Sequence, residues 1–249
     1  MEPLTVLPAD LGPGVRAAFT TRAGGVSVGP HAGLDLALHV GDDPGAVREN
    51  RALLAAWAGA PVRFARQVHG TTVVRVSEEA GAAVGDARIE PEADGLVTSQ
   101  VGVPLGVLVA DCLPVLLADA DAGVVAVAHA GRRGLLAGVL PRVVEAMIES
   151  GARPESVRAS IGPAAGGCCY EVPAGMLREA AAAVPELAAT TTGGTPSLDL
   201  RAGAAAQLRA AGVRAVTTVG GCTIEDESFY SYRRSRQTGR FAGVVVLAP

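Results

Sequence analysis

Two histidines and one cysteine stand beside runs of apolar residues in this sequence. His69 follows the apolar-rich stretch 62–68, Cys112 follows Leu105–Ala110, and His129 follows Val124–Ala128. A polar side chain at the end of a buried strand is held by a rigid element and faces a crevice, which is how many sites are built. These three residues are therefore the first candidates for chemistry.

Two imidazoles and one thiolate are a good ligand set for zinc, and three protein ligands leave the fourth tetrahedral position open for water. A zinc ion lowers the pKa of such a water from about 16 to about 7 and makes it a nucleophile at neutral pH. The sequence predicts a catalytic zinc site at His69, Cys112 and His129, with copper as the alternative metal. No compact finger or helical metal motif links the three residues.

The same residues allow other interpretations. Cys112 could attack a substrate with a histidine as its base, or it could be an inert buried thiol. Asp111 could orient a histidine or a water and act as a catalytic acid, although an Asp that ends a strand is more often a turn residue. A lone histidine at the end of a strand is more often structural.

The remaining cysteines and histidines are assigned structural roles. Adjacent cysteines rarely chelate one ion well, and Cys222 has no histidine near it in sequence. We also expect His31 and His39 to be solvated or structural. These assignments cover Cys168, Cys169, Cys222, His31 and His39.

Composition limits the classes of function. The chain has 249 residues, 49% of them hydrophobic, and a net charge of −4. All 21 basic residues are arginines, which codon bias explains, and no basic stripe is interleaved with aromatic residues, so we expect no nucleic-acid partner. We see no signal peptide and no apolar run long enough to cross a membrane. Four cysteines without a regular framework favour the reducing cytoplasm.

The pattern of apolar residues predicts an α+β fold in one domain over residues 1–249. Nearly continuous apolar runs predict strands that are covered on both faces. We expect polar or mobile loops at 80–92 and 188–195. The predicted strands are 15–21, 62–68, 72–76, 105–110, 115–118, 124–128, 213–219 and 241–247, and the predicted helices are 42–59, 134–150, 174–183 and 200–211.

Several segments together resemble the laccase-domain, or YfiH, family, which was first named multicopper polyphenol oxidase and was later reported to act on purine nucleosides. They run in the family order over nearly the whole chain. The matching segments are FTTRAGGVSVGP (19–30), HVGDDPGAVRENR (39–51), QVHG (67–70), ADGLVTSQ (93–100), ADCLPVLLAD (110–119), AHAGRRGLLAGVL (128–140), IGPAAGGCCYEV (161–172) and CTIEDESFYSYRRSRQTGRFA (222–242).

The resemblance implies that the family's metal ligands are His69, Cys112 and His129, the trio that the strand ends also indicate. It implies a four-layer α/β/β/α sandwich with mixed sheets, similar to cytotoxic necrotizing factor toxins. Two positions depart from the family pattern, Arg132 where a Trp is usual and Asp35 where an Asn is usual. We expect both to affect the wall of the pocket rather than the metal.

The resemblance also implies phosphorolysis of adenosine, inosine and methylthioadenosine together with adenosine deamination. The partners are then a nucleoside and phosphate, and we expect a monomer. Arg22, which lies beside a glycine turn, and Arg51 are candidate phosphate ligands. Neither a Walker A motif nor a dinucleotide-binding glycine motif is present.

Three other functions remain open. An amidase that edits peptidoglycan precursors could use the same metal. A binding protein with a structural zinc would need no open coordination position. Laccase activity needs several coppers and many histidines, and this chain has 4 histidines.

Overall fold

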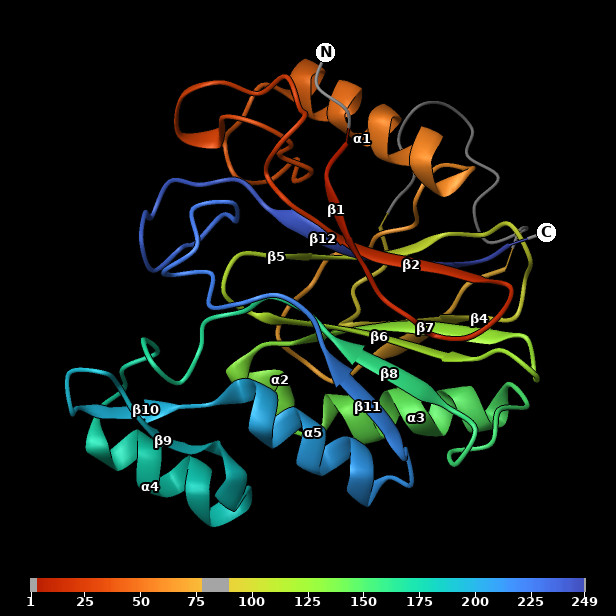
Figure 1. Ribbon diagram of the computed structural model, residues 1–249. Coiled ribbons are helices and arrows are strands. Elements are labelled where there is room, and N and C mark those ends of the chain that lie inside the picture. Colours follow the sequence, from red (N-terminus) through yellow and green to blue (C-terminus); the bar gives the residue numbers. More distant parts are fainter. Residues whose placement is uncertain (1–3, 78–89, 249) are drawn as a thin grey trace.

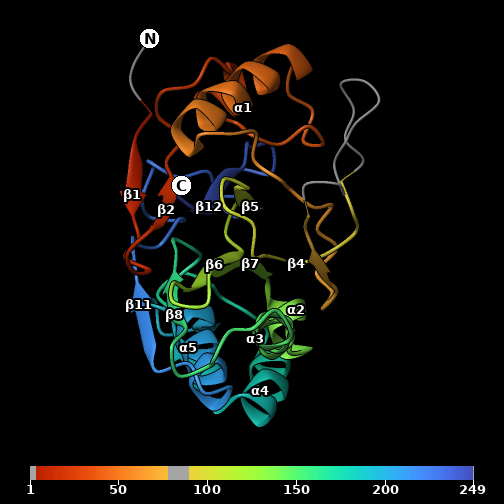
Figure 2. The ribbon, with the colours of Figure 1, turned by 90° about the vertical axis from the view of Figure 1, so that its right-hand side faces the viewer.

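The computed structural model describes residues 4–77 and 90–248, and they form four stacked layers (Figures 1 and 2). Helix α1 (Pro44–Ala58) covers the outer face of one sheet. A second sheet lies against the inner face of the first, and α2 (Arg132–Leu136), α3 (Val139–Glu149) and α5 (Leu200–Ala210) cover its outer face. The predicted α/β/β/α sandwich is confirmed.

The first sheet is antiparallel, and the second is mixed. The first has the order β1-β2-β12-β5, and the second has the order β11-β8-β6-β7-β4-β3, with parallel pairs at β11–β8 and β3–β4. A small hairpin, β9–β10, lies beside α4 (Ala174–Ala183). The strands are β1 (Val6–Pro8), β2 (Val15–Thr20), β3 (Val73–Arg75), β4 (Gly95–Thr98), β5 (Leu105–Val109), β6 (Leu113–Asp119), β7 (Val124–Ala130), β8 (Arg158–Ile161), β9 (Ala188–Thr190), β10 (Pro196–Leu198), β11 (Ala215–Thr218) and β12 (Phe241–Leu247).

Three apolar layers fill the spaces between the four structural layers. Successive residues of a strand point to opposite faces, so β6 places Val115 and Leu117 against the helices while Leu116 points to the first sheet. Strand β12 likewise places Val245 between the sheets and Val244 against α1. Strands buried on both faces explain the unbroken apolar runs of β5, β6 and β7.

Helix α1 begins and ends at the residues that the sequence predicts. The side chain of Asp43 accepts a hydrogen bond of 2.9 Å from the backbone N–H of Ala46, and Pro44 occupies the first turn. Gly59 ends the helix with a φ of 90°, a left-handed conformation in which glycine is favoured.

Three local predictions were wrong. Residues 62–68 form no strand and make only isolated bridges at Arg63 and Arg66. The predicted helix 134–150 is two helices, because Gly138 adopts a φ of 89° between α2 and α3. The predicted loop 188–195 begins with β9, which pairs with β10. Most of the predicted loop 80–92 lies outside the described residues. No helix in the described ranges is long and apolar enough to cross a membrane.

Candidate metal centre

His69 is held in the site by its backbone. Its φ of 63° lies in the left-handed region, which is unfavourable for a residue with a side chain. The buried carboxylate of Asp94 compensates, because it accepts hydrogen bonds from the backbone N–H groups of Val68, His69 and Gly70 at 3.2, 2.9 and 2.7 Å. These three hydrogen bonds therefore fix the turn that presents the His69 imidazole.

Cys112 lies where the chain passes from one sheet to the other. It follows β5 of the first sheet and directly precedes β6 of the second. The preceding residue, Asp111, has a φ of 82°, and among the described residues only Asp111 and His69 combine a side chain with a positive φ. The Asp111 carboxylate accepts bonds from the Thr223 hydroxyl at 2.7 Å and from the Arg233 backbone N–H at 2.6 Å. These bonds hold the strained connection in place.

His129 is buried near the end of β7, where it pairs with Pro114 of β6. Its Nδ1 lies 2.7 Å from Oδ1 of Asp94, which leaves Nε2 directed away from that carboxylate. A carboxylate that fixes the ring and tautomer of a metal-binding histidine is common in metal sites. Asp94 therefore positions two of the three predicted ligands: it binds the backbone N–H of His69 and the ring of His129.

The three predicted ligands meet in space. Their donor atoms all lie within 4.8 Å of one another, and the Cys112 sulfur is 3.6 Å from Nε2 of His69. The two imidazole rings are nearly perpendicular, with centroids 4.7 Å apart. A tetrahedral zinc ion with ligands at about 2.0–2.3 Å needs donor atoms less than about 4 Å apart. The cluster fits such an ion after small adjustments of the side chains.

A neighbouring glycine leaves room for this cluster. A Cβ atom at Gly131, which follows β7, would lie 2.7 Å from Cδ2 of His69 and 3.0 Å from the sulfur of Cys112. These distances are too short for a side chain, so the space in front of the three donors depends on glycine at this position.

The electrostatics of the cluster favour a thiolate. Burial opposes ionisation of Cys112, but the charge of His129 and hydrogen bonds from both histidines outweigh it and lower the pKa of the thiol to about 6. Burial also opposes protonation of His129, yet Cys112 and Asp94 together raise its pKa to about 9. A metal ion binds cysteine as the thiolate and histidine as the neutral imidazole. The positive charge of the ion would therefore take the place of the proton on His129.

The charge of one arginine, Arg240, acts on the cluster. Arg240 interacts electrostatically with Asp35, Cys112 and Asp111. Of the two candidate phosphate ligands, Arg22 donates to the Ala32 carbonyl. Arg51 donates to the Leu36 carbonyl and pairs with Glu90 at 2.9 Å. A guanidinium has five N–H donors, so these contacts leave some of them for an anion.

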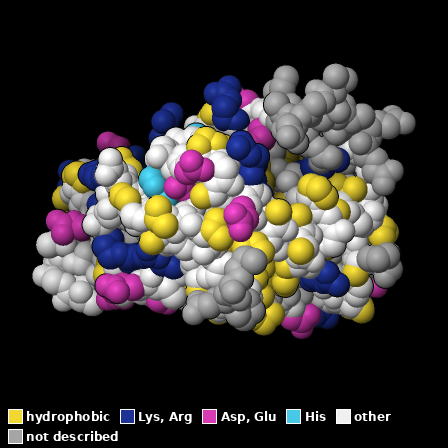
Figure 3. All heavy atoms as spheres, turned by 90° about the horizontal axis from the view of Figure 1, so that it is seen from above, with side chains coloured by type: hydrophobic (Ala, Val, Ile, Leu, Met, Phe, Trp, Pro, Cys, Tyr) yellow, Lys and Arg dark blue, Asp and Glu magenta, His cyan; other side chains and the backbone are white. Residues whose placement is uncertain are grey.

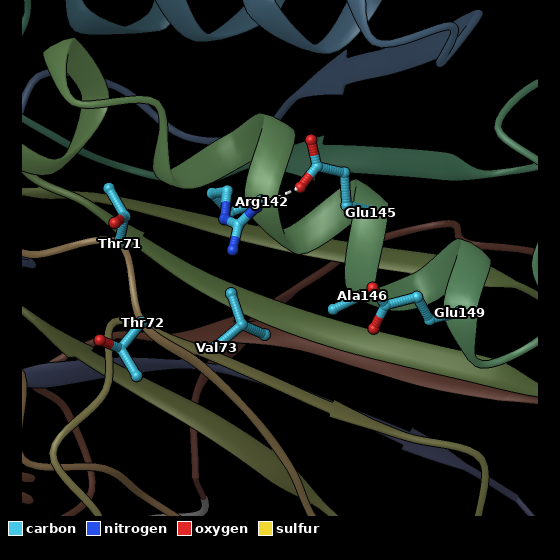
Figure 4. Close-up of a pocket in the computed structure, with 7 residues that line it drawn as sticks. All are labelled: Thr71, Thr72, Val73, Arg142, Glu145, Ala146 and Glu149. Carbon is cyan, nitrogen blue, oxygen red and sulfur yellow. Dashed lines mark hydrogen bonds and ion pairs between the residues drawn. The ribbon is translucent and has the colours of Figure 1, made fainter.

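The surface over α1 carries both charge signs (Figure 3). On the face that carries α1, arginine side chains lie at separate places with acidic side chains among them (Figure 3). A hollow of about 330 Å³ lies between residues 71–73 and α3, where Arg142 pairs with Glu145 (Figure 4). It contains none of the three predicted metal ligands.

The two positions that depart from the family pattern differ in burial. Arg132 is half-buried at the start of α2, while Asp35 is fully buried.

Asp94 is the main site residue that the sequence analysis missed. It stands directly before β4, and its family segment ADGLVTSQ was recognised without a role for the acid. Its signal in the sequence is an aspartate placed immediately before a buried apolar strand.

The family model described as multi-copper polyphenol oxidoreductase laccase matches residues 16–248. The chain belongs to this family. A Corynebacterium glutamicum protein named purine nucleoside phosphorylase is 48% identical over 236 residues, which are 94% of each chain. A protein of the same name from Streptomyces griseus is 50% identical over 233 residues, covering 92% of this chain and 93% of its own.

Solved structures of the family share the fold. The crystal structure of Neisseria meningitidis protein NMB0706 matches with a TM-score of 0.88 and 35% identity over 100% of both chains. That of the Bacillus licheniformis hypothetical protein YfiH has a TM-score of 0.84 and 31% identity, covering 94% of this chain and 92% of its own. The resemblance to the YfiH family is confirmed.

Proposed function

We propose that this protein is a metal-dependent purine nucleoside phosphorylase. The observation that carries the proposal is the convergence of His69, Cys112 and His129 on one point, in a chain about half identical to relatives that bear this name. The reaction transfers the sugar of a purine nucleoside from the base to phosphate and releases the free base and the sugar 1-phosphate. We propose adenosine, inosine and methylthioadenosine as its substrates.

A zinc ion at the three donors would supply a Lewis acid with an open coordination position. The side chains of the protein have separate tasks. Asp94 holds His69 and His129 in the ligating orientation through four hydrogen bonds. Arg240 places positive charge beside Cys112, where an anionic co-substrate would be stabilised. The proposed phosphate ligands remain Arg22 and Arg51.

Adenosine deamination is a second proposed activity of the same centre. Water adds to C6 of the purine, ammonia leaves, and inosine remains. This step needs a group that moves protons, and Asp111 is the candidate beside Cys112. Both of its carboxylate oxygens accept hydrogen bonds, from the Thr223 hydroxyl and the Arg233 N–H. Each oxygen accepts a single bond, so each has a second lone pair at which a proton could be held.

The ligand set favours these activities over laccase chemistry. Four histidines are present in the chain, and among the described residues neither group of metal-binding side chains contains more than two of them. A centre with several coppers needs more imidazoles than this arrangement provides. An amidase acting on a peptidoglycan precursor would use the same three ligands, and its test is the release of an amino acid from a UDP-linked peptide.

The test is a turnover assay on the purified, zinc-loaded protein with inosine, adenosine or methylthioadenosine. We expect free base and sugar 1-phosphate only when phosphate is present: ribose 1-phosphate from inosine or adenosine, and 5-methylthioribose 1-phosphate from methylthioadenosine. We expect inosine from adenosine without phosphate. Cys112→Ser and His69→Gln should lower kcat/KM by at least about 100-fold, since they remove ligands directly. Asp121→Asn, on an exposed turn, is the control. Absence of both products in the zinc-loaded protein would refute the proposal.

A further inference from the structure

The structure brings the other three cysteines into one cluster. The sulfurs of Cys168, Cys169 and Cys222 and a carboxylate oxygen of Glu225 all lie within 4.8 Å of one another. The thiols are free, and the Cys168 sulfur lies 3.4 Å from Oε2 of Glu225. The sequence analysis assigned structural roles to these cysteines, because adjacent cysteines rarely chelate one ion well and Cys222 has no histidine near it in sequence.

Two turns build this cluster, and the backbone joins them. Cys168 and Cys169 lie in a turn in which the Cys169 N–H donates to the Gly166 carbonyl at 2.9 Å. Cys222 begins a second turn, in which the N–H of Glu225 donates to the Cys222 carbonyl. A parallel bridge between Ala164 and Cys222 links the two segments. The four side chains are thus positioned by main-chain contacts and not by chance proximity of long side chains.

A backbone N–H group also donates to the sulfur of Cys222, and such a hydrogen bond stabilises a thiolate. The Gly166 N–H donates to this sulfur at 3.2 Å. Hydrogen bonds to a charged acceptor stabilise it. A Cβ at Gly166 would lie 3.1 Å from the Cys168 sulfur and 3.5 Å from that of Cys222, so glycine permits the close approach.

A half-buried cation, Arg201, lies beside this cluster. The guanidinium of Arg201 interacts electrostatically with Cys222 and Cys168, and it donates to the carbonyls of Ala164 and Gly221, which flank the two turns. Its Nε is buried and has no hydrogen-bond partner among the described residues. Three thiolates and one carboxylate around a divalent ion carry excess negative charge, which an adjacent guanidinium offsets.

We propose that Cys168, Cys169, Cys222 and Glu225 form a second metal site, which binds a thiophilic divalent cation of the zinc class. Tetrahedral zinc with sulfur ligands at about 2.3 Å sets the sulfurs about 3.8 Å apart, within the observed limit. Four protein ligands close the coordination sphere, which is typical of a structural site. The metal would clamp the two turns together.

This clamp bears on the first centre. The segment that follows Ala164 donates from the Ala165 N–H to the Asp111 carbonyl at 3.0 Å, and Thr223 donates to the Asp111 carboxylate. Asp111 directly precedes Cys112. A metal at the second site would therefore steady the support of the strained connection that carries Cys112.

The test is zinc titration of the metal-free, reduced full-length protein, with each cysteine followed by alkylation and mass spectrometry. We expect two zinc ions per chain in the wild type and one in Cys168→Ser/Cys222→Ser. Cys112→Ser should also bind one, at the second site. Zinc should slow alkylation of Cys168 and Cys169 at least about tenfold in the wild type and in Cys112→Ser.

Because the buried Cys222 contributes to folding, Glu225→Gln is the second variant. Glu225 is exposed, so the fold should survive, while the second zinc should bind at least about tenfold more weakly. Glu227→Gln, which is exposed and outside the cluster, should bind like the wild type. A wild type that binds one zinc, or whose Cys168 and Cys169 are alkylated equally fast with and without zinc, overturns the proposal. So does a Cys168–Cys169 or Cys168–Cys222 disulfide that reductant does not remove.

Discussion

Asp94→Asn is the most informative single substitution, because it changes the support of the metal centre without changing a ligand. The Asp94 side chain is fully buried. Its Oδ1 accepts from the His69 N–H and pairs with His129, and its Oδ2 accepts from Val68 and Gly70. An asparagine keeps the shape but has one acceptor oxygen, so two of the four bonds are lost and an amide donor faces other donors.

The expected magnitude follows from these contacts. Hydrogen bonds to a charged group contribute about 1.5–3 kcal/mol each, so we expect the substitution to destabilise the fold by about 3 kcal/mol. In a chain of this length that corresponds to a fall in Tm of about 6–12 °C. Loss of the carboxylate that orients His129 should weaken zinc binding about 10- to 100-fold.

The effect of Asp94→Asn depends on pH with a definite sign. Burial alone would raise the pKa of Asp94, but the bonds from His129 and the turn outweigh burial and lower it. An acid whose pKa is lower in the folded state stabilises that state above its unfolded pKa of about 3.9. The difference between the metal-free variant and wild type should therefore be complete at pH 7 and should shrink below about pH 4.

The assay is denaturant unfolding of both metal-free proteins from pH 3 to pH 8, with zinc titration at pH 7. Asp121→Asn serves as the matched control, since its side chain is exposed. If Asp94→Asn unfolds within about 0.5 kcal/mol of the control and binds zinc as tightly, the four bonds do not support the site and the argument fails.

Three further predictions concern the same site and its surroundings. Gly131→Ala should weaken zinc binding at least about tenfold by calorimetry, because its Cβ collides with His69 and Cys112; Gly175→Ala, which has open space, should not. Asp35→Asn should stabilise the fold by about 1–3 kcal/mol at pH 7, because burial raises the pKa of this carboxyl and one of its oxygens has no partner among the described residues. An acid whose pKa is raised in the folded state destabilises that state as the pH rises through the raised pKa. The stability gained by Asp35→Asn, measured by urea unfolding, should therefore be smaller at pH 4 than at pH 7. An equal gain at pH 4 and pH 7 would contradict this prediction. Zinc at about 100 times its Kd should stabilise the metal-free protein by about 2.7 kcal/mol, and a chelator should reverse this; an unchanged Tm would show that the metal does not prefer the folded state.

The sequence was sufficient for most of the core, and it indicated three candidate metal ligands whose donor atoms the structure brings together. Strands such as β5 and β7 are unbroken apolar runs, and α1 has a cap at each end, so local chemistry specifies them. The prediction of a strand at 62–68 was wrong because the apolar residues there pack in a loop that makes only isolated bridges. The prediction of one helix at 134–150 was wrong because Gly138 adopts a left-handed conformation, which the surrounding helical pattern of apolar residues does not reveal.

The sequence indicates candidate site residues where the residue type itself suggests a role. It misses residues whose role depends on which segments meet in space. His69, Cys112 and His129 are of metal-binding types at the ends of apolar runs and within family segments. Asp94 supports two of them through bonds that depend on how separate strands are aligned. The cluster of Cys168, Cys169 and Cys222 is formed by a bridge between segments far apart in sequence, and periodicity carries no information about such a bridge.

The passage of the chain from β5 to β6 has a consequence for how the protein matures. Cys112 comes into position only when the antiparallel sheet and the mixed sheet have docked, and His129 and Asp94 become neighbours only when β7 pairs with β4. Contacts between residues so far apart in sequence form late, because closing long loops is entropically costly. A nascent or partly folded chain therefore lacks the three-residue cluster, and a metal ion that uses these ligands could bind only after tertiary assembly is complete.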